Sequence, residues 1–96
     1  MPMRLRTSLP AKKDIKRLYR ASILKFGLAQ ADRYYDGLDR HFQHIARFPS
    51  SGTLRPDLGN LRLSRYGSHH VVYCIDENEI VVLRVLHGHQ DVGDAF

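Results

Sequence analysis

Two consecutive segments in the first half of the chain repeat apolar side chains with the period of an α-helix. In residues 11–26, apolar or small residues recur every three or four positions, and most lysines and arginines fall on the opposite face. In residues 28–45 the steps of three and four alternate strictly. The two stripes consist of Ala11, Ile15, Leu18, Ser22 and Phe26, followed by Leu28, Ala31, Tyr35, Leu38, Phe42 and Ile45. Each segment is therefore predicted to be an amphipathic helix that buries one face.

Pro10 and Gly27 mark ends of these helices. Proline at position 10 fits the first turn of a helix, where its missing N–H costs no hydrogen bond. Glycine readily adopts the backbone conformation that ends many helices, so Gly27 predicts the end of the first one. Because little more than this residue separates the two helices, we expect them to form an antiparallel hairpin.

Strands are predicted on both sides of the helical region. Residues 4–9 alternate basic with apolar or small side chains, which places Leu5, Thr7 and Leu9 on one side of a first strand. Residues 48–60 form a predicted loop, because two prolines and two glycines fall within them. Three further strands are then predicted at Leu61–Tyr66, His69–Asp76 and Glu79–His87, the last two joined by a turn at Glu77 and Asn78.

The last two strands are apolar on both faces. Strict alternation places Val71, Tyr73 and Ile75 opposite Val72 and Cys74, and it places Val81, Leu83 and Val85 opposite Ile80, Val82 and Leu86. Both faces of the sheet therefore need cover. The helical hairpin can cover one face, and we expect a binding partner on the other. The order β-α-α-β-β-β predicts an α+β domain, in which a helical hairpin packs on a mostly antiparallel, twisted sheet.

Length and charge narrow the classes of protein that this chain can belong to. Its 96 residues are enough for one small domain (residues 1–96), in which we expect residues 92–96 to form a flexible tail. Residues 1–48 hold eleven lysines and arginines against four acidic residues, which suits an acidic partner, either nucleic acid or protein, or a solvated helix face. No apolar run approaches the ~20 residues of a membrane span, so we expect a cytoplasmic protein with no membrane partner.

The segment "HGHQD", residues 87–91, has the spacing of a possible metal site. Alternate residues of an extended chain share a face, so His87, His89 and Asp91 are candidates for a set of two histidines and one carboxylate. Gly88 and the nearby strand end argue against a fixed extended geometry. The single cysteine, Cys74, excludes an internal disulfide and a cysteine-based zinc site. We therefore expect no metal ion and no cofactor.

A second candidate chemistry is acid–base catalysis. Arg62, Arg65 and Arg84 lie on neighbouring predicted strands and are candidates for a phosphate clamp, with His87 as the proton donor or acceptor. The alternative is structural, because an arginine within an apolar strand needs a partner or an exposed edge. A nearby carboxylate such as Asp91 would serve as that partner for Arg84.

Residues 9–92 resemble the ParE branch of the RelE/ParE superfamily of bacterial toxins. The resemblance rests on the order and spacing of five segments: "LPAKKDIKRLY", "FGLAQADRYYDGL", "FPSSGTLRPDLGNLRL", "YGSHHVVYCID" and "IVVLRVLHGHQD". The final pattern, a strand arginine followed by an aliphatic residue, leucine, histidine and a later aspartate, is the most specific part. One departure is Leu9, where the family usually has a capping serine or threonine, and Ser8 is the expected substitute.

The resemblance implies the β-α-α-β-β-β fold and a toxin without a catalytic centre. It implies that the chain inhibits growth by inhibiting DNA gyrase, that it forms a hetero-oligomer with a ParD-like antitoxin, and that it takes part in plasmid stabilisation without direct sequence-specific binding of nucleic acid. The RelE branch implies instead a ribosome-dependent mRNA endonuclease, for which the candidate residues are Arg62, Arg84 and His87. No tyrosine follows the last strand, which favours the ParE branch. A third possibility is a relative that only binds antitoxin.

Two sets of residues are predicted to contact these partners. For the target, the C-terminal region is implied by the resemblance, and the candidates are Arg65, His89, Asp91, Val92 and Phe96. For the antitoxin, Tyr19, Ile23 and Tyr34 form a second apolar strip on the helical hairpin, surrounded by lysines and arginines. A disordered acidic segment of an antitoxin would find apolar anchors and complementary charge there.

Overall fold

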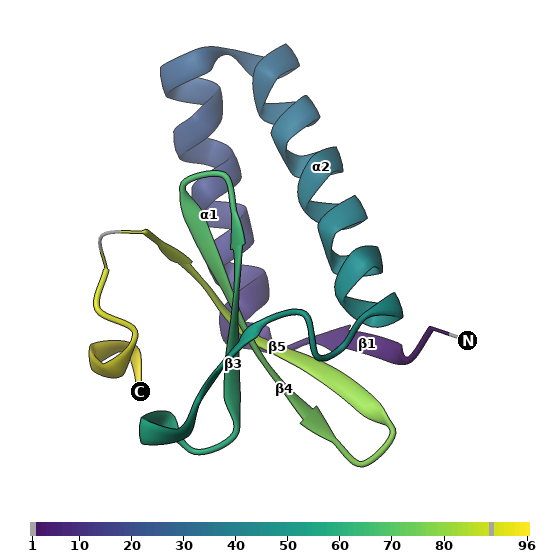
Figure 1. The fold of residues 1–96 in the computed structure, drawn as a ribbon. Helices are drawn as coiled ribbons and strands as arrows, with labels where there is room; N and C mark the ends of the chain where they lie inside the picture. Colours follow the sequence, from purple (N-terminus) through teal and green to yellow (C-terminus); the bar gives the residue numbers. More distant parts are fainter. Residues whose placement is uncertain (1, 89) are drawn as a thin grey trace.

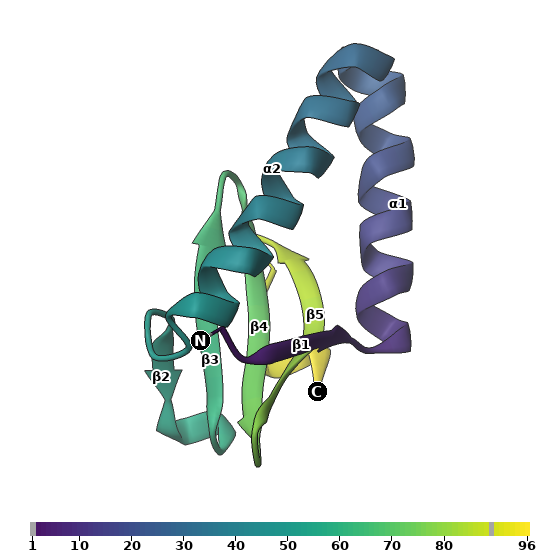
Figure 2. The same ribbon diagram turned by 90° about the vertical axis from the view of Figure 1, so that its right-hand side faces the viewer.

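A helical hairpin and a five-stranded sheet make up the molecule, which we describe from a computed structural model that covers residues 2–88 and 90–96 (Figures 1 and 2). The elements are β1 (Arg4–Thr7), α1 (Leu9–Phe26), α2 (Leu28–Arg47), β2 (Thr53–Arg55), η1 (Pro56–Leu58), β3 (Leu61–Tyr66), β4 (His69–Asp76), β5 (Glu79–His87) and η2 (Gly93–Ala95). The predicted α+β class, the hairpin and the bounds of the last three strands are confirmed. Strand β2, which lies within the predicted loop, is an addition.

The strands lie in the order β1-β5-β4-β3-β2, with β1 parallel to β5 and all other neighbours antiparallel. Strand β1 ends at Thr7, two residues earlier than the alternation predicts, because Ser8 caps α1. The backbone N–H of Ala11 donates to Oγ of Ser8 at 3.2 Å. Leu9 therefore opens the helix, where it is 64% exposed, and it does not extend the first strand.

The larger core lies between the hairpin and one face of the sheet. Gly27, with φ of +89°, ends α1 and precedes α2, as predicted. The buried members of this core are Ala11, Leu38, Ile45, Ala46, Val71, Tyr73, Ile80, Val82 and Val85. The end of the hairpin near Gly27 projects beyond the sheet (Figures 1 and 2). At that end the apolar faces of α1 and α2 have no sheet to pack against, so Phe26 and Leu28 remain 54% and 57% exposed. Among the described residues, no helix has both the length and the apolar composition that crossing a membrane requires.

A β-bulge in β5 changes which residues share a face. The register with β4 shifts so that Arg84 faces Val72 while Val82 faces Tyr73. Leu83 is thus the extra residue, and the strict alternation predicted from the sequence breaks there. Val85 joins Ile80 and Val82 under the helices, whereas Leu86 points to the other face. The predicted assignment of β5 residues to faces is therefore wrong beyond the bulge.

The chain's own C-terminal segment covers the second face of the sheet. Val92 is only 6% exposed and packs with Val72 and Leu86. The partly buried side chains around this cluster are Leu58, Leu61, Leu63 and Ala95. Val92, within the segment predicted to be a flexible tail, is therefore a core residue. The tail and η1 thus cover part of this face from within the chain, and the binding of a partner there stays a prediction.

Candidate functional site

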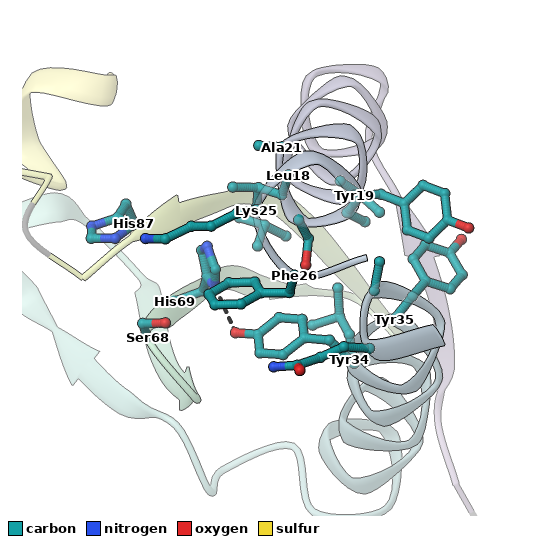
Figure 3. A pocket seen from close by; sticks show the side chains of 16 residues that line it. Leu18, Tyr19, Ala21, Lys25, Phe26, Tyr34, Tyr35, Ser68, His69 and His87 are labelled. Carbon is teal, nitrogen blue, oxygen red and sulfur yellow. Dashed lines mark hydrogen bonds between the residues drawn. The ribbon is translucent and has the colours of Figure 1, made fainter. Parts of the chain in front are cut away.

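A groove of about 410 Å³ lies between the helical hairpin and the ends of β4 and β5 (Figure 3). Leu18, Ala31 and Val85 contribute to its apolar lining. Phe26 and Tyr35, which are 54% and 47% exposed, also line it. Exposed aromatic and aliphatic side chains in a concave surface are typical of a site that binds an apolar segment of another protein. The hairpin is responsible for this groove, because α1 and α2 extend past the strands that they cover.

One end of the groove carries basic and titratable groups. Lys25, His69 and His87 lie there, and Figure 3 shows the Lys25 side chain extending toward the ring of His87. The Lys25 ammonium is 5.3 Å from the centre of the Phe26 ring. The rings of His69 and His87 meet edge to face, with 5.6 Å between their centres. No aspartate or glutamate belongs to the described lining of this groove.

His69 is held in place by a cluster of tyrosines at the turn between β3 and β4. The hydroxyl of Tyr34 lies 2.6 Å from Nδ1 of His69 and donates to the carbonyl oxygen of Tyr66 at 3.1 Å. In return, the hydroxyl of Tyr66 donates to the carbonyl oxygen of Tyr34 at 2.9 Å. Gly37 leaves room for this exchange, since a Cβ there would clash with the Tyr66 hydroxyl. Burial lowers the pKa of His69, and the nearby His87 and His70 lower it further.

Asp14 joins α1 to the part of β5 that lies beyond β1. Its carboxylate accepts hydrogen bonds from Nε of Arg84 at 2.7 Å and from the Val85 backbone N–H at 3.0 Å. Arg17 donates to the same carboxylate at 2.8 Å. Burial alone would raise the pKa of Asp14, but these hydrogen bonds and positive charges outweigh it and lower the pKa. Arg84 is therefore paired with Asp14, and the alternative partner Asp91 is wrong.

The three candidate catalytic residues of an endonuclease do not converge. Arg62 donates to the carbonyl oxygen of Gly52 at 2.9 Å and so holds the loop before β2. Arg84 is occupied by Asp14. Through its β4 partner Tyr73, Arg62 lies level with Val82, whereas His87 lies at the end of β5. Along β4, the partner of His87 is His69, four residues from Tyr73, which corresponds to roughly 13 Å at about 3.3 Å per residue.

The candidate target-binding residues are spread over the face of the sheet that the tail covers. Arg65 and Phe96 are exposed, and Phe96 retains 58% of its accessible surface. Val92 is buried, so it seats the tail and offers no surface to a target. Asp91 is exposed, and its carboxylate accepts a hydrogen bond from the Gly93 N–H at 2.9 Å. His89 lies outside the described residues, and within them no three histidine, cysteine or acidic side chains are arranged to hold a metal ion.

The candidate antitoxin-binding residues divide in a similar way. Tyr19 and Tyr34 line the groove, whereas Ile23 is partly buried and is not part of its lining. Tyr34 is a structural link between α2 and the β3–β4 turn as well as a groove residue. Tyr19 also borders a second hollow on the other side of the hairpin, where its hydroxyl donates to Asp32 at 2.5 Å. The predicted strip is therefore only partly a continuous surface.

The periodicity of the sequence identified some of these residues and missed others. Asp14 lies three residues after Ala11 and four before Leu18, on the buried side of α1, and this spacing was the available signal for its burial. The sequence pattern placed Lys25 and Phe26 at the end of a helix and gave no sign that they line a groove. His69 was predicted only as the first residue of a strand, and no sequence signal connects it to Tyr34, which is 35 residues earlier.

Comparison with known proteins gives the family and the fold. A family model described as the ParE toxin of type II toxin–antitoxin system, parDE, matches residues 5–92. The solved chromosomal ParDE system from P. aeruginosa has a TM-score of 0.77 at 17% sequence identity, covering 88% of this chain and 95% of that chain. The toxin–antitoxin complex RelBE2 from Mycobacterium tuberculosis has a TM-score of 0.61 at 26% identity, covering 91% of this chain and 99% of that chain. No curated protein sequence matches significantly.

Proposed function

This chain belongs to the ParE family of toxins from type II toxin–antitoxin systems, and from that premise we propose that it inhibits DNA gyrase by protein–protein contact. In this proposal the toxin acts in the cytoplasm and is neutralised by a ParD-like antitoxin, with which it forms a hetero-oligomer. No cofactor and no reaction catalysed by the toxin are required.

The binding partners of Arg62 and Arg84 support a toxin that catalyses no reaction. An endonuclease needs a proton donor or acceptor within hydrogen-bond reach of the reacting group and a cation near the phosphate. Arg84 is bound to a buried carboxylate, and Arg62 is bound to backbone carbonyl groups far along the sheet from His87. This separation is the single observation on which the choice against an endonuclease depends.

The groove at the hairpin is the proposed antitoxin site. Its exposed aromatic side chains, Phe26 and Tyr35, would receive apolar anchors of an antitoxin segment. Lys25 lies in its lining, and the basic composition of α1 would attract an acidic segment during association. Tyr19 and Tyr34 belong to this site, whereas Ile23 would contribute through the packing of the hairpin.

The proposed gyrase-binding surface is the side of the molecule on which the C-terminal tail lies. Arg65, Asp91 and Phe96 are exposed there and offer a cation, an anion and an aromatic ring to a protein target. Val92 would act indirectly, because it anchors the tail on the sheet. His89 is retained as a candidate from the sequence. Because the proposed antitoxin and target surfaces are separate, the bound antitoxin would exclude gyrase sterically.

Induction of the toxin in a bacterial host, with DNA supercoiling and mRNA integrity measured side by side, tests this function. We expect relaxed plasmid DNA and intact transcripts, and we expect co-expression of the antitoxin to restore supercoiling. Cuts in mRNA at regular codon positions would contradict the proposal and support the RelE-like endonuclease, which the similarity to RelBE2 keeps as the second candidate. If the toxin changes neither supercoiling nor mRNA but still binds the antitoxin, it is a relative that only binds antitoxin.

A further inference from the structure

The groove and the hollow on the other side of the hairpin differ in charge. The hollow combines Lys12 and Lys16 with Asp32 and Asp39, so its charges are mixed. The groove has Lys25, His69 and His87 at one end, and no carboxylate belongs to its described lining. A surface with apolar walls and one basic end binds a segment of matching asymmetry, with an apolar part in the middle and an acidic group at that end.

We propose that the basic end of the groove binds a carboxylate side chain of the antitoxin between Lys25, His69 and His87, and that a proton is taken up on His69 as the complex forms. This inference rests on the proposed antitoxin partner and adds to it the position of the acidic group and a dependence on pH. The acidic residue would lie beside an apolar anchor that contacts Phe26, because Phe26 and Lys25 are neighbours in sequence and in the groove.

The hydrogen bonds of His69 determine which nitrogen takes the proton. We assign the tautomer in which the single hydroxyl hydrogen of Tyr34 is donated to the carbonyl oxygen of Tyr66, at 3.1 Å, and Nδ1 of His69 is the donor in its 2.6 Å contact with Tyr34. Nε2 is then the ring nitrogen that gains or loses a proton. Neutral His69 presents a lone pair at Nε2, and protonated His69 presents a charged N–H donor, the group that a carboxylate prefers. The bond to Tyr34 is the same in both forms.

The surroundings of His69 favour its neutral form until a carboxylate arrives. Among the residues that the structure describes, the titratable and charged groups that face it or lie next to it are Lys25 on α1, Tyr34 on α2, Tyr66 on β3, His70 on β4 and His87 on β5. None of these side chains is an acid of the aspartate or glutamate type. Burial, followed by His87 and His70, lowers the pKa of His69 in the free toxin, and a bound carboxylate would raise it.

The pH dependence of binding follows from the lowered pKa of His69 in the free toxin and its raised pKa in the complex. A group whose pKa rises on binding gains a proton in the complex, so affinity increases as the pH falls from the higher pKa to the lower one. Above both pKa values, and below both of them, this contribution of His69 to the pH dependence disappears. Aspartate and glutamate of the antitoxin remain ionised throughout, because their usual pKa values lie near 4.

Isothermal titration of the toxin with its full-length ParD-like antitoxin tests the inference. We expect binding at least about tenfold tighter at about pH 5.5 than at about pH 8. Titrations near neutral pH in buffers of different ionisation enthalpy should show uptake of a fraction of one proton per complex. The variant His69→Gln should retain binding at the higher pH and lose most of the proton uptake.

Three further variants separate charge from folding. Lys25→Gln should weaken binding at both pH values and leave proton uptake in place. His44→Gln, a matched control at an exposed histidine outside the groove, should behave as the wild type. Should His69→Gln fail to fold, His87→Gln replaces it, because His87 is exposed at the strand end. Because His87 lowers the pKa of His69, we expect this variant to move the proton uptake on His69 to higher pH, and an unchanged pH dependence of binding would overturn the inference.

The possible failures are distinguishable. A complex whose affinity and proton uptake are unchanged by His69→Gln would overturn this inference and leave the antitoxin proposal standing. Normal binding by Lys25→Gln would place the carboxylate elsewhere and also overturn it. Absence of any complex at either pH would contradict the proposed antitoxin partner, and the inference would fall with it.

Discussion

At the scale of single residues, Asp14 is the charge on which the junction of α1 and β5 depends. It is 1% exposed and accepts hydrogen bonds from Arg84, Arg17 and the Val85 N–H. A buried carboxylate that is satisfied in this way is costly to alter, because its partners would be left buried without it. Arg84, which the sequence suggested for phosphate binding, has a structural role in this network.

Asp14→Asn should therefore lower the free energy of unfolding by about 3 kcal/mol, since it leaves the buried part of Arg84 without its anion. Chemical denaturation near neutral pH measures this loss. Asp57→Asn is the matched control, because Asp57 pairs with Arg55 in an exposed ion pair and should change stability little. Equal losses in the two variants would show that Asp14 is no more than a surface charge.

Asp14 also contributes to the loss of folding stability at acid pH. The pKa of Asp14 is lower in the folded chain than its ordinary value. A lowered pKa contributes stability that is fully present above the unfolded-state pKa, about 4, and is lost as the pH falls through the folded-state pKa. The stability of the wild type should thus fall more steeply below about pH 4 than that of Asp14→Asn. Parallel curves of unfolding free energy against pH would contradict this assignment.

At the scale of elements, the projecting hairpin makes a groove from side chains that an ordinary core would bury. Phe26 lines it, and nearby Leu24 is 89% exposed and lies outside it. Phe26→Ala should weaken antitoxin binding at least about tenfold, or ~1.4 kcal/mol, without altering the helical circular dichroism. Leu24→Ala removes a similar exposed apolar group and should bind normally. Equal losses of affinity in the two variants would mean that the antitoxin binds the tip of the hairpin instead of the groove.

The C-terminal segment combines a buried anchor with an exposed end. Val92→Ala should lower the free energy of unfolding by about 2 kcal/mol, because it leaves a cavity against Val72 and Leu86. Phe96→Ala should leave stability nearly unchanged, since Phe96 is 58% exposed, and should reduce gyrase inhibition. Melting curves and supercoiling assays on both variants measure these effects. Full gyrase inhibition by a folded Phe96→Ala variant would remove Phe96 from the target surface.

The elements could be predicted because their patterns are simple, and the exceptions have physical causes. Strands β3, β4 and β5 are bounded by turn residues and rich in apolar side chains, so their limits were found from the sequence alone. The bulge at Leu83 was not found, because inserting one residue into a strand that is apolar on both faces leaves no mark on the pattern. The alternation extended the first strand through Ser8 and Leu9, because a helix start and an extended segment look alike there, whereas the resemblance correctly indicated Ser8 as the helix cap.

The candidate site was less accessible to prediction than the fold. Periodicity marks Tyr34 as a helix residue, but His69 meets it only once β4 has packed against α2. Likewise Asp14 and Arg84 are 70 residues apart, and no local rule pairs them. Contacts between distant segments depend on the register and bulge of the sheet, which no local sequence pattern reveals.

At the scale of the whole molecule, two surfaces lie on different sides of the fold. The groove opens between the hairpin and the ends of β4 and β5, and the tail covers the opposite face of the sheet. An antitoxin bound in the groove would leave the tail in place and would block a target by its own volume. Such an arrangement requires no active site, which is consistent with the separation of Arg62, Arg84 and His87.

The most direct test of this account is a supercoiling assay with purified gyrase and increasing amounts of the toxin. We predict that supercoiling falls as toxin approaches the concentration of gyrase, as expected for an inhibitor that acts by binding, and that equimolar antitoxin restores it. Toxin that leaves gyrase fully active at a large excess, while it cuts mRNA on translating ribosomes at substoichiometric amounts, would contradict the account.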